Sequence, residues 1–245
     1  MKQVFLSIKE NIALTYSVYR MVLSGDVSGV TNCGQFVNIK LDGLFLRRPI
    51  SVCDCEGNEL TLVYKVVGKG TEQMSRMTKG EVLDVLVGLG NGYDTSVSGQ
   101  NPLIIGGGVG VPPMYMLCKK LISEGKAPTV ILGFNKADEV FYEKEFEKLG
   151  ARVIVTTVDA SYGVRGFVTD AMAGLDYSYF YTCGPEPMLK AVYRATNTGG
   201  QFSFEERMGC GFGACMGCSC KTVTGYKRIC KEGPVLCKEE ILWEK

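Results

Sequence analysis

Histidine is absent from the 245 residues of this chain. Its absence excludes Ser-His-Asp and Cys-His nucleophilic catalysis, zinc enzymes with imidazole ligands, and Rieske iron–sulfur centres. The chain also lacks an excess of charge, because 27 Lys and Arg residues stand against 26 Asp and Glu residues. A general nucleic-acid-binding protein would need a basic surplus or patch. We therefore expect neither a histidine-based active site nor a nucleic acid partner.

Long apolar runs are absent as well. No segment approaches the ~18 uninterrupted apolar residues of a membrane span. The apolar stretch before Lys9 and Glu10 is too short for a secretory signal. With 46% hydrophobic and 22% charged residues, the chain can nevertheless bury a sizeable core. We expect a soluble, cytoplasmic protein without a membrane segment.

Cysteine, in contrast, is abundant, with 11 residues. In a reducing compartment such cysteines are more often metal ligands than disulfides, and a chain of this length and apolar content does not need disulfide cross-links. The densest group begins in a glycine-rich segment at residues 209–220. The spacing C-x4-C-x2-C-x11-C is formed by Cys210, Cys215, Cys218 and Cys230.

The first part of this spacing is typical of plant-type [2Fe–2S] proteins, in which one tight loop delivers three thiolates to a compact cluster. Glycines between the cysteines let backbone N–H groups approach the bridging sulfides. A four-thiolate zinc site is the alternative, although zinc sites more often combine two C-x2-C pairs. From the residues alone, Cys220 and Cys237 compete with Cys230 as the fourth ligand.

The residue pattern changes twice along the chain and predicts an α+β, multi-domain fold. Residues 1–98 contain short β-branched and aromatic runs between Gly, Asn and Asp turns, which indicates an antiparallel β-barrel or sandwich. Residues 99–201 alternate buried strands with helices, which indicates a doubly wound parallel α/β domain. Residues 202–245 form a small C-terminal cysteine module. Expected strands lie at 12–21, 60–67, 81–87, 103–105, 130–132, 153–156 and 179–181, and expected helices at 113–123, 138–149, 168–173 and 185–195.

A glycine-rich loop separates the first strand and the first helix of the middle part. Such a turn brings backbone N–H groups and a helix N-terminus to a pyrophosphate, and a plain tight turn is the alternative. A second loop, at 183–185, follows another strand at the carboxyl edge of the sheet, where ligands bind. The predicted NAD site comprises Gly106, Gly108, Gly110, Pro113, Cys183, Gly184 and Pro185. NAD is favoured over NADP because 133–136 offers one Lys and no Arg for a 2′-phosphate.

The β-rich part contains a third group of residues with binding chemistry. An Arg fork and a Ser hydroxyl at 47–51 suit a diphosphate, and the Gly70-Thr71 turn adds further donors. Surface residues and a hairpin turn are the alternative interpretation.

Together, these motifs resemble the ferredoxin-reductase-like flavoproteins, and over nearly the full length the electron-transfer subunits of the heteromeric, NAD-linked class of dihydroorotate dehydrogenase. The resemblance rests on 48–51, 63–71, 90–92, 106–113, 183–185 and 205–211. It implies FAD binding by Arg48, Pro49, Ile50, Ser51, Val63, Tyr64, Lys65, Gly70 and Thr71. It also selects Cys230 as the fourth cluster ligand. Lys65 stands where Arg is common in the family.

The resemblance further implies an electron-transfer role. A nicotinamide transfers a hydride, a [2Fe–2S] cluster transfers single electrons, and a flavin does both. The implied partner is an FMN-containing catalytic subunit that interconverts dihydroorotate and orotate in pyrimidine biosynthesis, in a heterotetramer with two copies of each chain. No catalytic residue is expected on this chain. Two alternatives are a reductase subunit for ferredoxin, sulfite reductase or hydrogenase, and a non-enzymatic metal or redox sensor.

Overall fold

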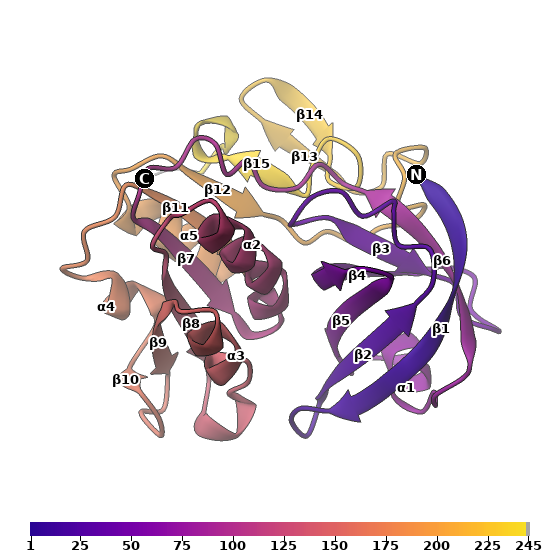
Figure 1. The fold of residues 1–245 in the computed structure, drawn as a ribbon. Coiled ribbons are helices and arrows are strands. Elements are labelled where there is room, and N and C mark those ends of the chain that lie inside the picture. The colour runs from indigo at the N-terminus through magenta and orange to yellow at the C-terminus, as the bar shows by residue number, and fades with distance from the viewer. Residues whose placement is uncertain (244–245) are drawn as a thin grey trace.

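The computed structural model describes residues 1–243 of the chain. These residues form a closed barrel, a seven-stranded sheet and a two-stranded hairpin (Figure 1). The barrel and the sheet lie side by side, and the hairpin lies above them both. No helix in residues 1–243 has the length and apolarity needed to cross a membrane.

The barrel confirms the antiparallel β structure expected for the first part. Its strands are β1 (Lys2–Ala13), β2 (Val18–Ser24), β3 (Phe36–Ile39), β4 (Arg48–Glu56), β5 (Glu59–Lys65) and β6 (Val82–Leu89), and they close in the order β1-β2-β5-β4-β3-β6. Helix α1 (Lys69–Ser75) connects β5 to β6. In β1, Val4, Leu6 and Ile8 alternate with more exposed residues, so every second side chain fills the barrel.

The strand expected at 12–21 is wrong, because a turn interrupts it. Leu14 N–H donates to Val18 O at 2.8 Å, which reverses the chain between β1 and β2. The hydroxyl of Thr15 accepts the N–H of Val18 at 3.1 Å and closes the same turn. The β-branched threonine therefore acts as a turn residue through its side-chain oxygen.

The seven-stranded sheet confirms the doubly wound arrangement. It contains β7 (Pro102–Gly107), β8 (Thr129–Phe134), β9 (Arg152–Thr157), β10 (Val164–Arg165), β11 (Tyr179–Cys183), β12 (Gly200–Ser203) and β15 (Val235–Cys237), in the order β10-β9-β8-β7-β11-β12-β15. All neighbouring pairs are parallel except β12 with β15. The direction of winding reverses between β7 and β11, which is where ligands bind in such sheets.

Helices cover both faces of this sheet. They are α2 (Val111–Ser123), α3 (Glu143–Lys148), α4 (Val168–Met172) and α5 (Glu186–Ala195). Helices α2 and α3 pack in one apolar core with Ile104, whereas α4 and α5 pack in another with the next residue, Ile105. The helix expected at 138–149 begins only at Glu143, since Tyr142 adopts a left-handed conformation with φ 69°. This bend buries the side chains of Phe141 and Tyr142 in the first core.

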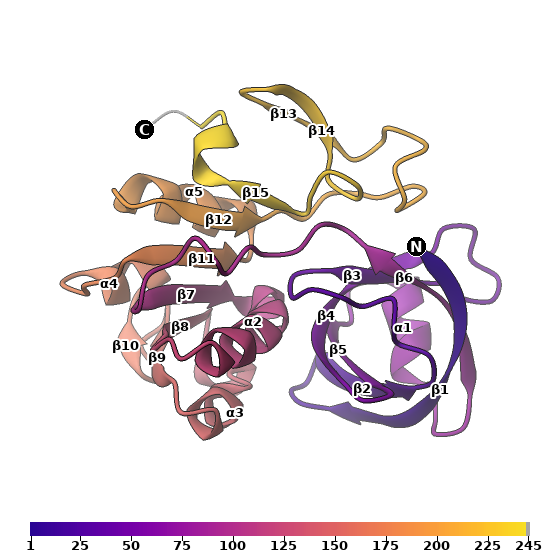
Figure 2. The same cartoon turned by 45° about the horizontal axis from the view of Figure 1, so that its top comes forward.

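The C-terminal part combines the hairpin, β13 (Ser219–Thr222) with β14 (Gly225–Arg228), and strand β15, which returns to the sheet beside β12 (Figure 2). Its buried residues Cys218, Ile229 and Cys230 share one apolar core with Phe202 of the sheet and Phe36 of the barrel. The cysteine loop is thereby held against both larger units.

Candidate cofactor-binding sites

The cysteine loop directs backbone N–H groups at its own sulfur atoms. Ala214 N–H donates to Cys210 Sγ at 3.2 Å, and Gly217 N–H donates to Cys215 Sγ at 3.4 Å. Burial opposes ionisation of Cys210, but N–H groups of Phe212, Cys215 and Ala214 outweigh it and lower the pKa of this thiol to about 6. A loop that stabilises negative charge on sulfur fits a metal-bound thiolate.

The four predicted ligands form two pairs. Cys210 N–H donates to Cys215 Sγ at 3.4 Å, and Cys230 N–H donates to Cys218 Sγ at 3.4 Å. Cys218 and Cys230 are each 2% exposed, and their thiols contact each other. No group of three or more Cys, Asp or Glu side chains within residues 1–243 stands arranged to hold a metal ion. Two pairs of thiols fit a cluster of two irons, each of which takes two cysteine ligands.

The two competing cysteines lie elsewhere. Cys237 lies on β15 as an exposed residue. Partial burial of its thiol and the carboxylates of Glu240 and Glu239 raise the pKa of that thiol. Cys220 follows on β13, where burial and Glu206 raise the pKa of its thiol. Cys230, in contrast, is buried beside Cys218, whose Sγ accepts its N–H at 3.4 Å, and for this reason Cys230 stays the predicted fourth ligand.

The predicted FAD residues gather at one end of the barrel. Arg48 opens β4, and its guanidinium lies directly on α1, because a Cβ at Gly70 would stand 2.2 Å from Arg48 Nε. Thr71 Oγ1 accepts Val67 N–H at 2.9 Å and Gly68 N–H at 3.3 Å, which fixes the turn between β5 and α1. The Thr71 hydroxyl in turn donates to Gly68 O at 3.1 Å, so this side chain shapes the turn, and the Arg48 guanidinium beside it is the group suited to a diphosphate. Pro49, Ile50 and Ser51 continue β4 as half-buried residues.

The three predicted residues on β5 differ in what they can offer a flavin. Tyr64 is 2% exposed and points into the barrel, where its hydroxyl donates to Asn11 Oδ1 at 3.0 Å. Val63 points the other way, into the core shared with the α/β domain. Lys65, the last residue of β5, is half-buried. A ligand at Tyr64 would therefore meet its backbone rather than its phenol.

The two loops of the predicted NAD site lie against each other. Strands β7 and β11 are neighbours, with Gly106 opposite Cys183. A Cβ at Gly110 would stand 2.2 Å from the carbonyl oxygen of Cys183, and one at Gly106 would stand 2.9 Å from Val111 Cα. Glycine at these two positions therefore lets the two loops pack backbone against backbone at the start of α2. Gly108 has φ +52° and nothing within 4 Å of its Cβ position.

Two prolines and one cysteine of the predicted NAD site lie at the starts of α2 and α5 and at the end of β11. Pro113 lies buried in the first turn of α2, and Pro185 directly precedes α5. Burial raises the pKa of the Cys183 thiol to about 12, although Ser203 hydrogen-bonds to it. Burial therefore favours the neutral form of the Cys183 thiol at pH 7.

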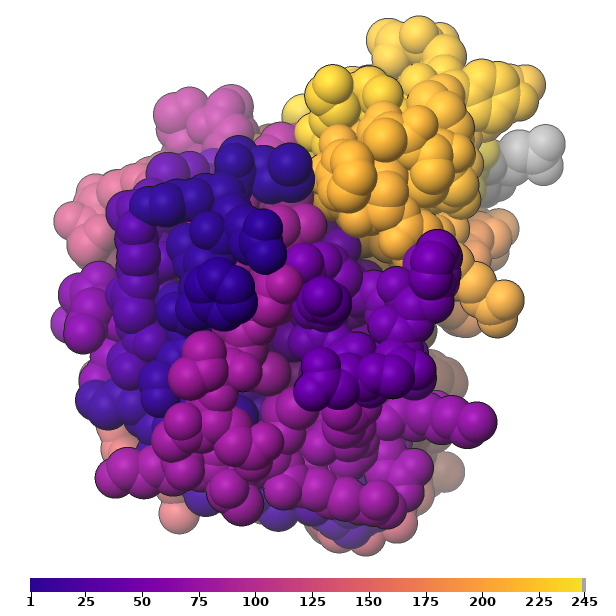
Figure 3. All heavy atoms as spheres, turned by 90° about the vertical axis from the view of Figure 1, so that its right-hand side faces the viewer, coloured from indigo at the N-terminus to yellow at the C-terminus, as the bar shows by residue number. Residues whose placement is uncertain are grey.

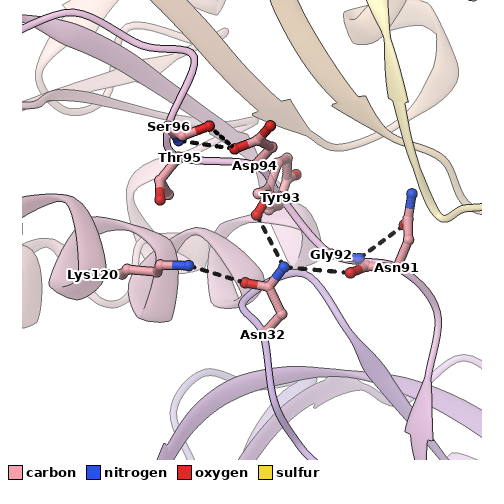
Figure 4. A pocket seen from close by; sticks show the side chains of 8 residues that line it. All are labelled: Asn32, Asn91, Gly92, Tyr93, Asp94, Thr95, Ser96 and Lys120. Atoms are coloured by element: carbon pink, nitrogen blue, oxygen red, sulfur yellow. Dashed lines mark hydrogen bonds between the residues drawn. The ribbon is translucent and has the colours of Figure 1, made fainter.

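A cavity of about 400 Å³ lies outside all the predicted site residues (Figure 4). It is lined by Asn32, Asn91, Gly92, Tyr93, Asp94, Thr95, Ser96 and Lys120. Asn32 Nδ2 donates to Tyr93 O at 3.1 Å, and Lys120 Nζ donates to Asn32 Oδ1 at 3.3 Å. These bonds secure the segment that connects the barrel to the sheet. The Gly90-Asn91-Gly92 motif was the sequence signal for this place, without an assigned role.

Comparisons with known proteins agree with this geometry. The family model described as "Iron-sulfur cluster binding domain of dihydroorotate dehydrogenase B" matches residues 205–242, and "Oxidoreductase NAD-binding domain" matches residues 104–194. The chain is similar to an NADH-dependent reduced ferredoxin-NADP oxidoreductase of solved structure, with TM-score 0.89 and 29% identity over 98% of this chain and 90% of that chain. A ferredoxin NADP+ reductase from Neisseria gonorrhoeae shares the fold, with TM-score 0.70 and 16% identity over 80% of this chain and 90% of that one.

Curated relatives cover almost the whole chain. The dihydroorotate dehydrogenase B (NAD(+)) electron transfer subunit of Fusobacterium nucleatum subsp. nucleatum is 42% identical over 96% of both chains. The subunit of the same name from Bacillus pumilus is 42% identical over 98% of both chains. At this identity and coverage, the chain belongs to the family of dihydroorotate dehydrogenase B electron transfer subunits.

Proposed function

We propose that this chain passes electrons between NAD(H) and a partner subunit that interconverts dihydroorotate and orotate, the oxidation step of pyrimidine biosynthesis. The observation that carries the proposal is the pairing of four thiols, Cys210 with Cys215 and Cys218 with Cys230. The backbone N–H groups of the cysteine loop also stabilise negative charge on its sulfur atoms. When bound, NAD(H) supplies a hydride, FAD converts between two-electron and one-electron transfer, and a [2Fe–2S] cluster carries single electrons.

The residues of the chain serve to bind and orient these groups. The glycine loop at 106–113 and the loop at 183–185 present backbone N–H groups at the sheet edge. Arg48, Gly70 and Thr71 form the diphosphate end of the FAD site on the barrel. We propose domains at 1–98, 99–201 and 202–245, although β12 crosses the second boundary and β15 of the last domain pairs with the sheet of the second. No acid–base residue is required, which agrees with the lack of histidine.

The partner is an FMN-containing catalytic subunit, and we propose two copies of each chain in the assembly. The names of the curated relatives support a partner chain, since an electron transfer subunit serves another subunit, whereas the FMN and the stoichiometry rest on the family resemblance. Large apolar side chains lie exposed on the cluster loop and on the connection between β3 and β4. Figure 3 shows these two parts of the chain, orange and violet, on one face of the molecule. The side chains are Phe45, Leu46, Phe212 and Met216, exposed by 99%, 44%, 44% and 55%. A cytoplasmic location is supported by the eleven cysteines, four of them proposed iron ligands, because such a cysteine content without disulfides is typical of a reducing compartment.

Spectroscopy of the purified chain tests the electron-transfer role. We expect flavin bands and broad cluster absorption that NADH bleaches, and NADH-dependent reduction of a dye. The chain alone should not oxidise dihydroorotate, whereas the co-expressed catalytic subunit should restore NAD-linked oxidation. A colourless protein that binds zinc would refute the proposal.

A reductase for a different acceptor is the second candidate, because the similar solved structure is named as a ferredoxin-NADP oxidoreductase. A comparison of acceptors separates the two functions. Faster turnover with reduced or oxidised ferredoxin than with the dihydroorotate-linked partner would favour the second candidate.

A further inference from the structure

One side chain of the barrel touches the cluster loop directly. Asn38 on β3 donates from Nδ2 to the carbonyl oxygen of Cys210 at 3.1 Å, across 172 positions of sequence. Asn38 is 1% exposed. A Cβ at Gly211 would stand 2.3 Å from the same Nδ2, so the loop backbone rests on the amide. Gly211 also has φ +77°, which favours glycine at this contact.

The same residue lies in the frame of the predicted FAD site. Asn38 lies opposite Pro49 of β4 in the antiparallel pair β3–β4, and Pro49 belongs to the segment predicted to bind FAD. Arg47 Nη1 donates to Asn38 O at 3.3 Å and to Asp84 Oδ1 at 2.9 Å, so the backbone of Asn38 is held firmly. One rigid residue therefore links the FAD-binding strand to a predicted iron ligand.

Packing alone does not explain an amide here. Its neighbours Val37 and Ile39 are fully buried apolar residues, and Asn38 Oδ1 is buried without a hydrogen-bond partner among the described residues. A leucine would avoid the cost of this unsatisfied oxygen. What the asparagine provides, and leucine cannot, is the hydrogen bond to Cys210.

We propose that Asn38 is a positioning residue for electron transfer between the flavin and the cluster, an inference that rests on the proposed function. Its amide fixes how closely the Cys210 side of the cluster loop approaches β4. By donating to the carbonyl of the peptide between Cys210 and Gly211, it also polarises that peptide's N–H. Hydrogen bonds and dipoles around the sulfurs influence the reduction potential of iron–sulfur clusters.

Two variants test this role in the holoprotein that carries FAD and cluster. Asn38→Leu removes the donor, and Asn38→Asp keeps the shape but replaces the donor by an acceptor. Gln35→Leu is the matched control, since Gln35 is also a buried barrel amide, 6% exposed, but bonds to Gly90 O at 3.0 Å. Rapid mixing with NADH follows flavin absorbance, and freeze-quenched electron paramagnetic resonance follows reduction of the cluster.

Both Asn38 variants should keep FAD, iron and the rate of flavin reduction. Cluster reduction should slow at least tenfold, with an altered resonance signal and a less favourable reduction equilibrium against a reference dye. Gln35→Leu should leave these readouts unchanged. Cluster reduction within twofold of wild type in either Asn38 variant would overturn the inference. So would loss of the cluster from both variants but not from the control, because Asn38 would then serve assembly. If the wild-type chain lacks NADH-dependent flavin reduction, the proposed function fails instead.

Discussion

The ammonium group of Lys119 lies 3.1 Å from Asp54 Oδ2, and so joins α2, the helix after the glycine loop, to β4, the strand of the predicted FAD site. The same nitrogen lies 2.7 Å from Glu56 Oε2. The neighbours of these residues in sequence, Cys53 of β4 and Cys118 of α2, belong to one buried apolar core. The relative placement of the two predicted nucleotide sites therefore depends on a polar clamp over an apolar interface.

Removing the clamp should weaken the contact between barrel and sheet. Lys119→Met should lower the free energy of unfolding by about 1 kcal/mol, because Asp54 is partly shielded from water and loses its partner. Urea unfolding measures the loss. Lys190→Met, which removes an exposed pair with Glu186 inside α5, serves as the control and should cost less than about 0.5 kcal/mol. Equal losses would contradict a special role for Lys119.

Cys215→Ser should abolish the cluster. Cys215 shares backbone hydrogen bonds with Cys210, and a serine hydroxyl does not replace the thiolate that iron prefers. Iron and labile sulfide should fall to background, NADH should still reduce the flavin, and transfer to the partner should stop. Cys237→Ser, at the exposed thiol on β15, should keep a full cluster. Full coupled turnover by Cys215→Ser would disprove the relay.

Gly110→Ala should separate the two loops of the NAD site. The new Cβ would meet the carbonyl oxygen of Cys183 at 2.2 Å, and backbone cannot move aside as a side-chain end can. We expect a loss of stability of about 1–3 kcal/mol. Binding of NAD+, which does not reduce the oxidised flavin, should weaken by about tenfold or more in a calorimetric titration. The control Gly125→Ala adds a side chain at φ +79° where nothing lies nearby, so it tests backbone strain alone and should leave NAD+ affinity unchanged.

Stability should decline above pH 9. Burial raises the pKa of Cys53 and of Cys118 from 9.0 to about 12. Below pH 9 both states of the protein hold these protons, but between pH 9 and 12 only the unfolded state releases them. Each thiol then reduces stability by ~1.4 kcal/mol per pH unit. Between pH 9 and 12, the free energy of unfolding of Cys118→Ala should therefore fall less steeply with pH than that of the wild type, by ~1.4 kcal/mol per pH unit. An unchanged slope would show that Cys118 ionises in the folded protein.

Phe45 should contribute to binding of the catalytic subunit. Its side chain is 99% exposed on the connection between β3 and β4, and buried aromatic anchors dominate many protein interfaces. Phe45→Ala should weaken association by ~2 kcal/mol, or roughly 30-fold, in a titration calorimetry experiment. Phe167→Ala, 63% exposed at the start of α4, provides the control. Similar small effects at both positions would place the interface elsewhere.

The sequence predicted the order of the domains and the glycine and cysteine loops, because turn chemistry and metal ligation impose local spacings. It missed features that depend on distant partners. The turn at Thr15 and the bend at Tyr142 arise where chain reversal or burial overrides local propensity. The inward direction of Tyr64 depends on the closed barrel, and the Asn38–Cys210 contact joins positions 172 residues apart. The cysteine ligand set remains a prediction that Cys215→Ser tests.

Strand β15 pairs with β12, with Val235 opposite Ser203, so the cluster-bearing segment at 204–234 starts and finishes at neighbouring points of a single sheet. It is thus an inserted loop whose two ends are fixed by the pairing of β12 with β15. Strand β15 also covers the edge of β12, which would otherwise be open to solvent. The base of this loop belongs to the NAD-binding sheet, whereas its Cys210 side is bonded to Asn38 of the barrel. Any rocking of the sheet against the barrel would therefore have to break that hydrogen bond or bend the loop, so the loop acts as a strut that resists such motion.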